Sequence, residues 1–365
     1  MLGIYLHVPF CKSKCPYCDF YSLTGWDGDL LDRYVTSLCE AIRRYDPQEA
    51  DTLYFGGGTP SLLGGRRIGR LIDACAERFG LAGAEITLEA NPADDLADTL
   101  RDFAAAGGNR LSLGMQAAVD RELAALGRRH RMADLYKTAE DAKRAGIRNL
   151  SLDLMLATPG QTEQSVRRAA EVCRELEATH LSAYLLKIEP GTPFAVHPPA
   201  LPEEDAAADR YLLACRVLEQ AGYAQYEISN FSLPGYESRH NLKYWNGDPY
   251  LGFGPAAHSF YGGKRWAYPR DLAGFLAGGL PVEERDEEIP AGSPEEYAML
   301  RLRLTAGLTE REFAARFGAP VPADWKRRAA ALPAGLVQTG EGGIRLTREG
   351  FLVSTPLIAR ILEGD

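Results

Sequence analysis

The chain has 365 residues, of which 45% are hydrophobic and 25% are charged, and these proportions are ordinary for a globular protein. Its formal net charge of −9 argues against a general nucleic-acid binder, and no run approaches the ~20 apolar residues of a membrane span. The N-terminus lacks the basic stretch and the cleavage site of a signal peptide. We therefore expect a cytoplasmic protein without a membrane span, and peripheral contact with a membrane is left open.

Residues 1–225 alternate β-rich runs with amphipathic helical stretches. Parallel strands need helical crossovers, so six strand–helix units in series predict an α/β fold with a parallel sheet. Six units with short loops suit a partial (β/α)6 TIM-like barrel better than a closed barrel of eight. The expected strands are 4–8, 52–55, 85–89, 110–113, 150–154 and 180–186, and the expected helices are 29–44, 66–79, 95–106, 133–145, 163–176 and 203–221.

The pattern changes after residue 225. Residues 226–290 are rich in Gly, Pro, Tyr and Trp and predict an irregular linker with short antiparallel pieces. Residues 291–365 predict a C-terminal α+β module that resembles a winged helix, and its mixed charges favour a packing or covering role over DNA binding. Its expected elements are helices at 295–304, 309–317, 323–331 and 350–362 and a hairpin at 336–346.

Three cysteines, Cys11, Cys15 and Cys18, follow the first expected strand with the spacing C-x3-C-x2-C. Four thiolates usually hold a four-iron cluster, so three leave one iron open to a small molecule. A zinc site with His7 as the fourth ligand, or three unused thiols, are the alternatives. Zinc is disfavoured because this single motif lacks a second Cys/His pair. The other four cysteines lie among apolar residues at helical positions and are expected to be small buried side chains.

Polar or glycine-rich residues recur at the C-terminal ends of the expected strands, which is where barrel folds of this kind carry their chemistry. Each of them, taken singly, is also compatible with a capped or ion-paired loop residue. Arg128 lies further along the chain and can pair a carboxylate through two hydrogen bonds. Together they predict one shared site. The strand-end residues are Gly56, Gly57, Gly58, Thr59, Glu89, Gln116 and Asp153.

The cysteine triplet beside Tyr17, followed by GGGTP, resembles the radical S-adenosylmethionine (SAM) proteins. The longer segments YLHVPFCKSKCPYCDF, GGGTPSLL, LEANP, RLSLGMQ and YEISNF…HNLKYW…YLGFGPAAHS resemble the oxygen-independent coproporphyrinogen III oxidase group, and most of all its haem-chaperone branch. The resemblance covers nearly the whole chain.

This resemblance implies a [4Fe–4S] cluster on the three cysteines, with SAM on the open iron through its amino and carboxylate groups. A reduced cluster, supplied by an electron donor, would pass one electron to the sulfonium and release a 5′-deoxyadenosyl radical. The glycine loop would serve the amino end of SAM and Tyr17 its adenine. By the same resemblance, the SAM contacts are Tyr5, Tyr17, Gly57, Gly58, Thr59, Glu89, Gln116, Arg128 and Asp153.

A second cofactor is suggested by the segment HNLKYW, which begins at His240. A lone histidine is usually structural, although an imidazole can ligate haem iron. The H-N-x-x-Y-W haem motif of the family matches this segment letter for letter, so the resemblance implies haem at His240. His258, in PAAHS, is a rival ligand. The aromatic and basic neighbours that suit a macrocycle and its propionates are Arg239, Lys243, Tyr244 and Trp245.

Two departures separate the chain from the oxidases themselves. The oxidases have a further cysteine where this chain has Phe20, and they carry a longer segment before the cysteines. Both favour a haem chaperone that delivers haem to acceptor haemoproteins. The alternatives are a coproporphyrinogen III oxidase that decarboxylates propionates and a zinc-stabilised structural protein.

Overall fold

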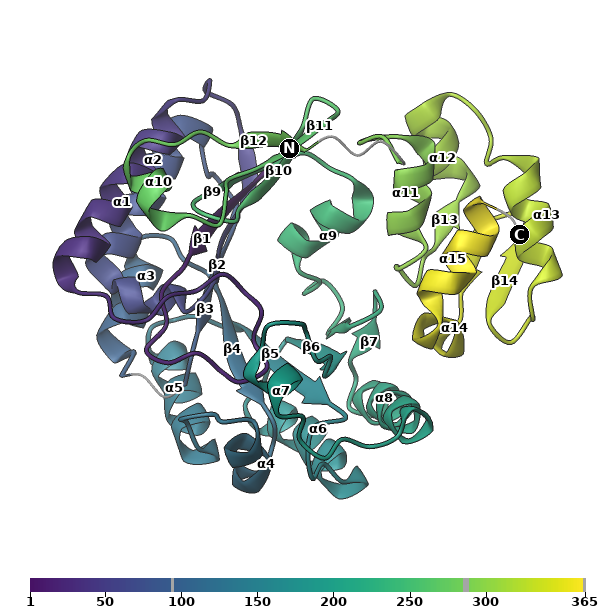
Figure 1. Cartoon of the computed structure of the whole chain (residues 1–365), viewed down its shortest axis with the longest axis horizontal. Helices are drawn as coiled ribbons and strands as arrows, with labels where there is room; N and C mark the ends of the chain where they lie inside the picture. The colour runs from purple at the N-terminus through teal and green to yellow at the C-terminus, as the bar shows by residue number, and fades with distance from the viewer. Residues whose placement is uncertain (93–94, 285–288, 364–365) are drawn as a thin grey trace.

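The computed structural model describes residues 1–92, 95–284 and 289–363. One twelve-stranded sheet has the order β12-β11-β10-β9-β1-β2-β3-β4-β5-β6-β8-β7, and β1 to β6 are parallel neighbours. They curve into an open barrel (Figure 1). The expected partial (β/α)6 barrel is therefore confirmed. Its strands are β1 (Leu2–Val8), β2 (Ala50–Gly57), β3 (Glu85–Ala90), β4 (Arg110–Gln116), β5 (Asn149–Leu156) and β6 (His180–Leu185).

Helices cover the outer side of these strands (Figure 1). The apolar faces of the longer helices pack on the outward strand residues in one core, and Leu123 and Phe194 of two short helices belong to a second, smaller cluster. The Asp27 carboxylate fixes the start of the first helix by accepting the Leu30 N–H at 2.8 Å. The helices are α1 (Gly28–Arg43), α2 (Gly65–Phe79), α3 (Ala97–Ala105), α4 (Asp120–Ala125), α5 (Met132–Arg144), α6 (Glu163–Glu175), α7 (Pro193–Val196) and α8 (Glu204–Gln220), with a 3-10 turn η1 (Pro60–Leu63).

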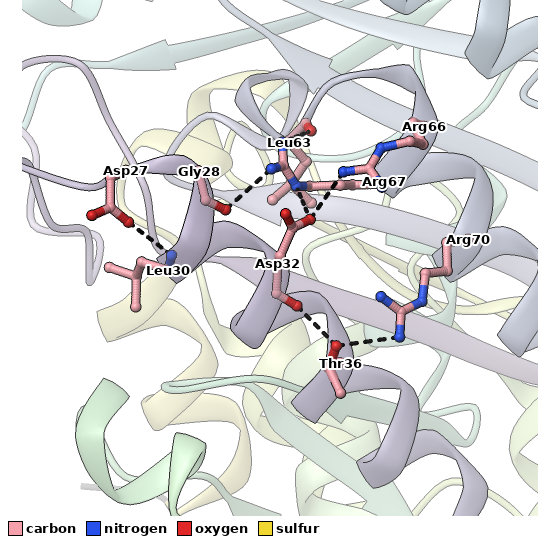
Figure 2. Close-up of polar contacts among 9 residues, drawn as sticks. All are labelled: Asp27, Gly28, Leu30, Asp32, Thr36, Leu63, Arg66, Arg67 and Arg70. Carbon is pink, nitrogen blue, oxygen red and sulfur yellow. Dashed lines mark hydrogen bonds and ion pairs between the residues drawn. The ribbon is translucent and has the colours of Figure 1, made fainter.

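Polar contacts tie α1 to α2 above the core (Figure 2). The Asp32 carboxylate accepts from Arg67 Nε at 2.7 Å and from Arg66 Nη2 at 3.2 Å. One turn further, Arg70 Nη2 donates to Thr36 Oγ1 at 3.2 Å. These groups are largely exposed, so they orient the two helices and add little to stability.

The inner face of the barrel is polar. Cross-strand neighbours on this face include Tyr5 beside Tyr54, and Asp153 beside Ser182. The helix α9 (Arg239–Asn246) lies within the curve of the sheet (Figure 1). The N–H groups of its first two residues donate to the Glu85 carboxylate at 3.3 and 3.2 Å. The helix therefore fills the barrel near the starts of the strands and leaves their C-terminal ends free.

Short strands within residues 226–290 join the two edges of the barrel sheet, and several of them pair antiparallel as expected. Strand β9 pairs in parallel with β1, and β10, β11 and β12 extend the sheet antiparallel beyond it. The boundaries of the three expected domains stay predictions. The added elements are β7 (Ala224–Gln225), β8 (Asn230–Ser232), β9 (Tyr250–Phe253), β10 (His258–Tyr261), β11 (Lys264–Ala267), α10 (Leu272–Leu276) and β12 (Val282–Glu284).

The C-terminal module lies to one side of the barrel (Figure 1) and has the expected helices and hairpin. Arg316 Nη2 links it to the barrel by donating to Gly247 O at 2.7 Å. The expected last helix is split at Val353, whose backbone leaves the helical region. The module comprises α11 (Pro294–Arg301), β13 (Leu308–Thr309), α12 (Glu310–Phe317), α13 (Ala323–Ala331), β14 (Val337–Gly340), β15 (Gly343–Leu346), α14 (Arg348–Leu352) and α15 (Ser354–Leu362).

None of the helices in the described ranges is long and apolar enough to cross a membrane.

Candidate cluster and SAM site

The three cysteines lie in the loop between β1 and α1, at the C-terminal end of the barrel. Backbone hydrogen bonds hold the loop: Cys11 N–H donates to Leu23 O at 2.9 Å, and Cys18 N–H donates to Cys15 O at 3.1 Å. The indole of Trp26 donates to Cys11 O at 3.0 Å. All three thiols are free and partly exposed, whereas the other four cysteines are buried as expected.

A cavity of about 280 Å³ opens between this loop and the strand ends. The structure therefore brings together expected site residues that are up to 142 positions apart in the chain, from Cys11 to Asp153. Three of the expected site residues, Tyr5, Gly56 and His240, are absent from its lining. The expected residues that line it are Cys11, Cys15, Tyr17, Cys18, Gly57, Gly58, Thr59, Glu89, Gln116, Arg128 and Asp153.

The glycine loop after β2 packs directly on the residues that precede the cysteines. Gly58 N–H donates to Val8 O at 2.8 Å, and a Cβ on Gly58 would lie 2.7 Å from Phe10 O. Gly57 has a φ of +114°, which side chains rarely tolerate. Because neither residue has a side chain, the backbone of Gly57 and Gly58 can lie close to the cysteine loop on one side and to a ligand in the cavity on the other.

Arg128 joins the cysteine loop to the opposite wall of the cavity. Its Nη1 lies 3.4 Å from Cys15 Sγ and 3.3 Å from Tyr17 Oη, and its Nη2 donates to Gly114 O at 3.2 Å. Its Nε is buried without a hydrogen-bond partner. The guanidinium therefore places a positive charge beside the thiols, where a carboxylate ligand can pair with it.

Two carboxylates face the cavity from neighbouring parts of the sheet. Glu89 accepts from Tyr54 Oη at 2.8 Å and from Gly57 N–H at 3.2 Å. Burial, and then the charge of Asp153, raise the pKa of Glu89 to about 7. Burial also raises the pKa of Asp153, which accepts from Ser112 Oγ at 3.2 Å. Two such carboxylates suit a cationic ligand, because a positive charge relieves both the burial and the repulsion.

Gln116 lines the cavity with an unusual backbone conformation. Gln116 has a positive φ of 63°, and its side-chain oxygen accepts from Tyr184 Oη at 3.2 Å. That hydrogen bond helps hold an otherwise disfavoured backbone shape beside the cavity.

Several other lining residues were not expected from the sequence. Ser112 is paired with Glu89 and Ser182 with Asp153 on neighbouring strands, and Tyr184 shares the face of Ser182 because residues two apart point the same way. The missed residues include Tyr54, Ser112, Ser182 and Tyr184.

Tyr5 and His240 lie deeper in the barrel. The hydroxyl of Tyr5 is 3.1 Å from His7 Nδ1. His240 is 1% exposed, with Thr52 Oγ1 2.8 Å from its Nδ1 and Tyr244 Oη 2.8 Å from its Nε2. Burial lowers the pKa of His240 to about 3, so the ring is neutral. In this conformation both ring nitrogens are engaged, and neither is available to an iron atom.

The basic neighbours of His240 are also engaged. Lys243 Nζ lies 2.6 Å from Asp51 Oδ1 and donates to Met1 O at 2.9 Å. Arg239 lies 3.4 Å from the other oxygen of Asp51. Both cations are therefore paired with Asp51 near the start of β2, and their expected pairing with haem propionates stays a prediction.

The three thiols around the cavity are sulfur donors of the kind that hold iron–sulfur clusters. In the described parts of the chain, no three His, Cys, Asp or Glu side chains converge as the ligands of one metal would. Cluster thiolates bind separate irons and need only surround a cavity, as the three cysteines here do.

Comparisons with known proteins agree with this geometry. The model of the Radical SAM superfamily matches residues 5–173, and the model of the HemN C-terminal domain matches residues 293–353. A protein named heme chaperone HemW from Mycobacterium tuberculosis H37Rv is 37% identical over 99% of this chain and 94% of its own length. The chain belongs to the HemW family of radical SAM proteins.

Other HemW relatives span similar lengths. The heme chaperone HemW of Bacillus subtilis is 33% identical over 99% of both chains, and that of Escherichia coli K12 is 38% identical over 87% of this chain and 86% of its own. Among solved structures, the coproporphyrinogen III oxidase HemN of E. coli, described as a radical SAM enzyme, superposes with a TM-score of 0.83. It is 22% identical over 99% of this chain and 90% of that one, so it shows a shared fold.

Proposed function

We propose that this protein is a haem chaperone that binds a [4Fe–4S] cluster, SAM and haem and delivers haem to acceptor haemoproteins. The carrying observation is the full-length similarity to proteins named heme chaperone HemW, at 37% identity. The cavity supports it, because it joins three free thiols to residues expected to bind SAM.

Cys11, Cys15 and Cys18 would hold three irons of the cluster and leave the fourth for SAM. The cluster with SAM supplies one-electron chemistry when both are bound. The thiolates would lie beside the Arg128 guanidinium, 3.4 Å from Cys15 Sγ, which offsets part of their negative charge. Burial raises the pKa of the Cys18 thiol, so cluster binding must displace a proton there.

The remaining lining residues would bind and orient SAM. The ionised Glu89 would attract the positively charged amino and sulfonium groups of SAM from across the cavity. Arg128 would pair with the carboxylate of SAM. The backbone of Gly57 and Gly58 allows close approach at the amino end. Tyr17 would cover the adenine, since its ring packs against Phe194 with centroids 6.3 Å apart and is fixed in place.

For haem, the family motif makes His240 the sequence-based candidate ligand. Use of this residue would require its Nε2 to leave Tyr244 and α9 to shift within the barrel. Leaving the freed hydroxyl buried and unpaired costs about 1–3 kcal/mol. His240 therefore serves as a haem ligand only in a conformation in which α9 has moved.

Anaerobic reconstitution tests the proposal. The chain should take up about four iron and four sulfide, bind SAM, and then bind ferric haem with a shifted Soret band. The proposal would be contradicted by one zinc per chain without sulfide, or by a reconstituted chain that does not bind haem. Cys39→Ala is a matched control for loss of a cysteine, because Cys39 is buried in α1 away from the cavity.

The main competing function is that of a coproporphyrinogen III oxidase. In this chain the side chain next to the cluster loop is Phe20, which is exposed and lines the cavity. Turnover of coproporphyrinogen III by the reconstituted chain would favour the oxidase.

A further inference from the structure

The six histidines divide into two groups by exposure. Four are buried in the barrel, where neighbouring oxygens lie at their ring nitrogens: both nitrogens in His7, His180 and His240, and Nε2 in His130. Two imidazoles, those of His197 and His258, are exposed. In the conformation described, a macrocycle that approaches from solvent can be ligated by either of these two.

His258 is oriented by a carboxylate. It begins β10, and its Nδ1 lies 3.1 Å from Glu284 Oε1 on β12, with the side chains 59% and 42% exposed. Histidines that bind metals usually donate their second ring N–H to a carboxylate, which fixes the tautomer and makes the free nitrogen a better ligand. With Nδ1–H directed to Glu284, the lone pair of Nε2 is left for an iron atom.

Apolar side chains also lie beside His258, on the same face as Glu284 and Arg265. His258 is paired with Ala267 on β11, which is paired with Val282 on β12, so the three side chains share one face of the sheet. Val282 is 60% exposed, and Leu280, two residues before it, is 65% exposed. Exposed apolar side chains beside an oriented imidazole suit the flat, largely apolar face of a porphyrin.

The segment that follows β11 contacts the cysteine loop. Leu272 N–H donates to Tyr21 Oη at 3.0 Å, and Arg270 Nη2 pairs with Asp19 at 3.7 Å, one residue after Cys18. The Arg270–Asp19 pair is long and exposed, so Arg270 can exchange Asp19 for a propionate at little cost.

The other exposed imidazole lacks these features. His197 follows the four-residue helix α7 and precedes two prolines. No ion pair or hydrogen bond of its ring is found in the described ranges, and so nothing holds one ring nitrogen toward a ligand. His197 is therefore a matched control for an exposed histidine that is not oriented.

We propose that His258, oriented by Glu284, is an axial ligand of haem on the face formed with Ala267 and Val282, and that Arg270 pairs with a propionate. The Nε2 lone pair binds ferric iron in place of water, with no change in oxidation state. This inference rests on the proposed haem-chaperone function and assigns its cargo to this face of the sheet.

Ferric haem titration of the full-length, cluster-loaded chain tests it, with Soret absorption and electron paramagnetic resonance as readouts. His258→Ala should weaken haem binding at least tenfold and remove the signature of a bound imidazole, and added imidazole should restore that signature. Glu284→Gln should weaken binding about tenfold, the lower end of the range for the partner of a ligating histidine. His197→Ala should bind haem within twofold of the wild type.

A wild-type signature retained in His258→Ala would overturn this inference and leave the proposed function standing. So would loss of the imidazole signature in His240→Ala, provided that variant keeps its cluster and its circular dichroism. A wild-type chain that binds no haem would instead overturn the proposed function. Val282→Asp gives a second check, because a carboxylate in place of an apolar side chain on this face should weaken binding while His258 is intact.

Discussion

Replacing Glu89 with Gln should stabilise the cluster-free chain while weakening SAM binding. Burial, followed by the charge of Asp153, raises the pKa of Glu89 from 4.5 to about 7. A shift of that size corresponds to about 3 kcal/mol of unfavourable free energy when the carboxylate is ionised. The carboxylate is partly open to the cavity, so we expect a gain of about 2 kcal/mol at pH 8.

The sign depends on pH. The folded chain holds a proton on Glu89 up to about pH 7, whereas the unfolded chain releases it near 4.5. Stability therefore falls as pH rises through this window and stays lower above it. Glutamine does not titrate, so the gap between the variant and the wild type should be near zero at pH 4.5 and complete at pH 8.

Urea denaturation of the cluster-free chain at several pH values measures this gap. Glu175→Gln is a control of opposite sign, because a hydrogen bond from Arg168 lowers the pKa of Glu175 to about 2 and its ionised form stabilises the fold. In the cluster-loaded chain, Glu89→Gln should weaken SAM binding about tenfold and flatten the rise in wild-type affinity around pH 7. A variant no more stable than the wild type at pH 8, or a gap independent of pH, would refute this reasoning.

Three further outcomes follow from contacts in and below the cavity. Cys15→Ser should abolish the visible absorption of the reconstituted cluster, and an unchanged spectrum would remove Cys15 from the ligand set. Gly58→Ala should cost about 1–3 kcal/mol in urea denaturation and reduce cluster uptake, because its Cβ would meet Phe10 O at 2.7 Å; full uptake with wild-type stability would contradict this. Tyr244→Phe should cost about 1–3 kcal/mol by leaving His240 Nε2 unpaired, and wild-type stability would show that this hydrogen bond contributes little.

The parallel barrel and the cysteine cavity could be predicted from sequence because both follow local rules. Helical and strand periodicities alternate over residues 1–225, and the C-terminal ends of parallel strands meet at one edge. Glu89 and Asp153 end expected strands, and so their meeting at the cavity follows from the topology. Tyr54 and Ser182 also line the cavity, but a single tyrosine or serine in a strand carries no sequence signal that separates a lining residue from any other inward-facing one.

The strands that residues 226–290 add to the sheet, and the burial of His240, depend on long-range contacts that no local sequence pattern reveals. Strand β9 has only four residues, and its partner in the sheet, β1, lies about 250 positions earlier in the chain. The motif around His240 lies inside the barrel, where Thr52, 188 residues away, and Glu85, 155 residues away, hold it, and its haem role stays a prediction. The motif could be recognised from the sequence alone. The burial of His240 could not, because it depends on contacts with residues far away in the chain.

One anaerobic experiment tests the central claim most directly. The reconstituted chain, with SAM and a reductant, is given haem and a haem-free acceptor haemoprotein, and in parallel coproporphyrinogen III. We expect haem to move from the chain to the acceptor, and no decarboxylated porphyrinogen to form. Turnover of coproporphyrinogen III without haem transfer would contradict the haem-chaperone function.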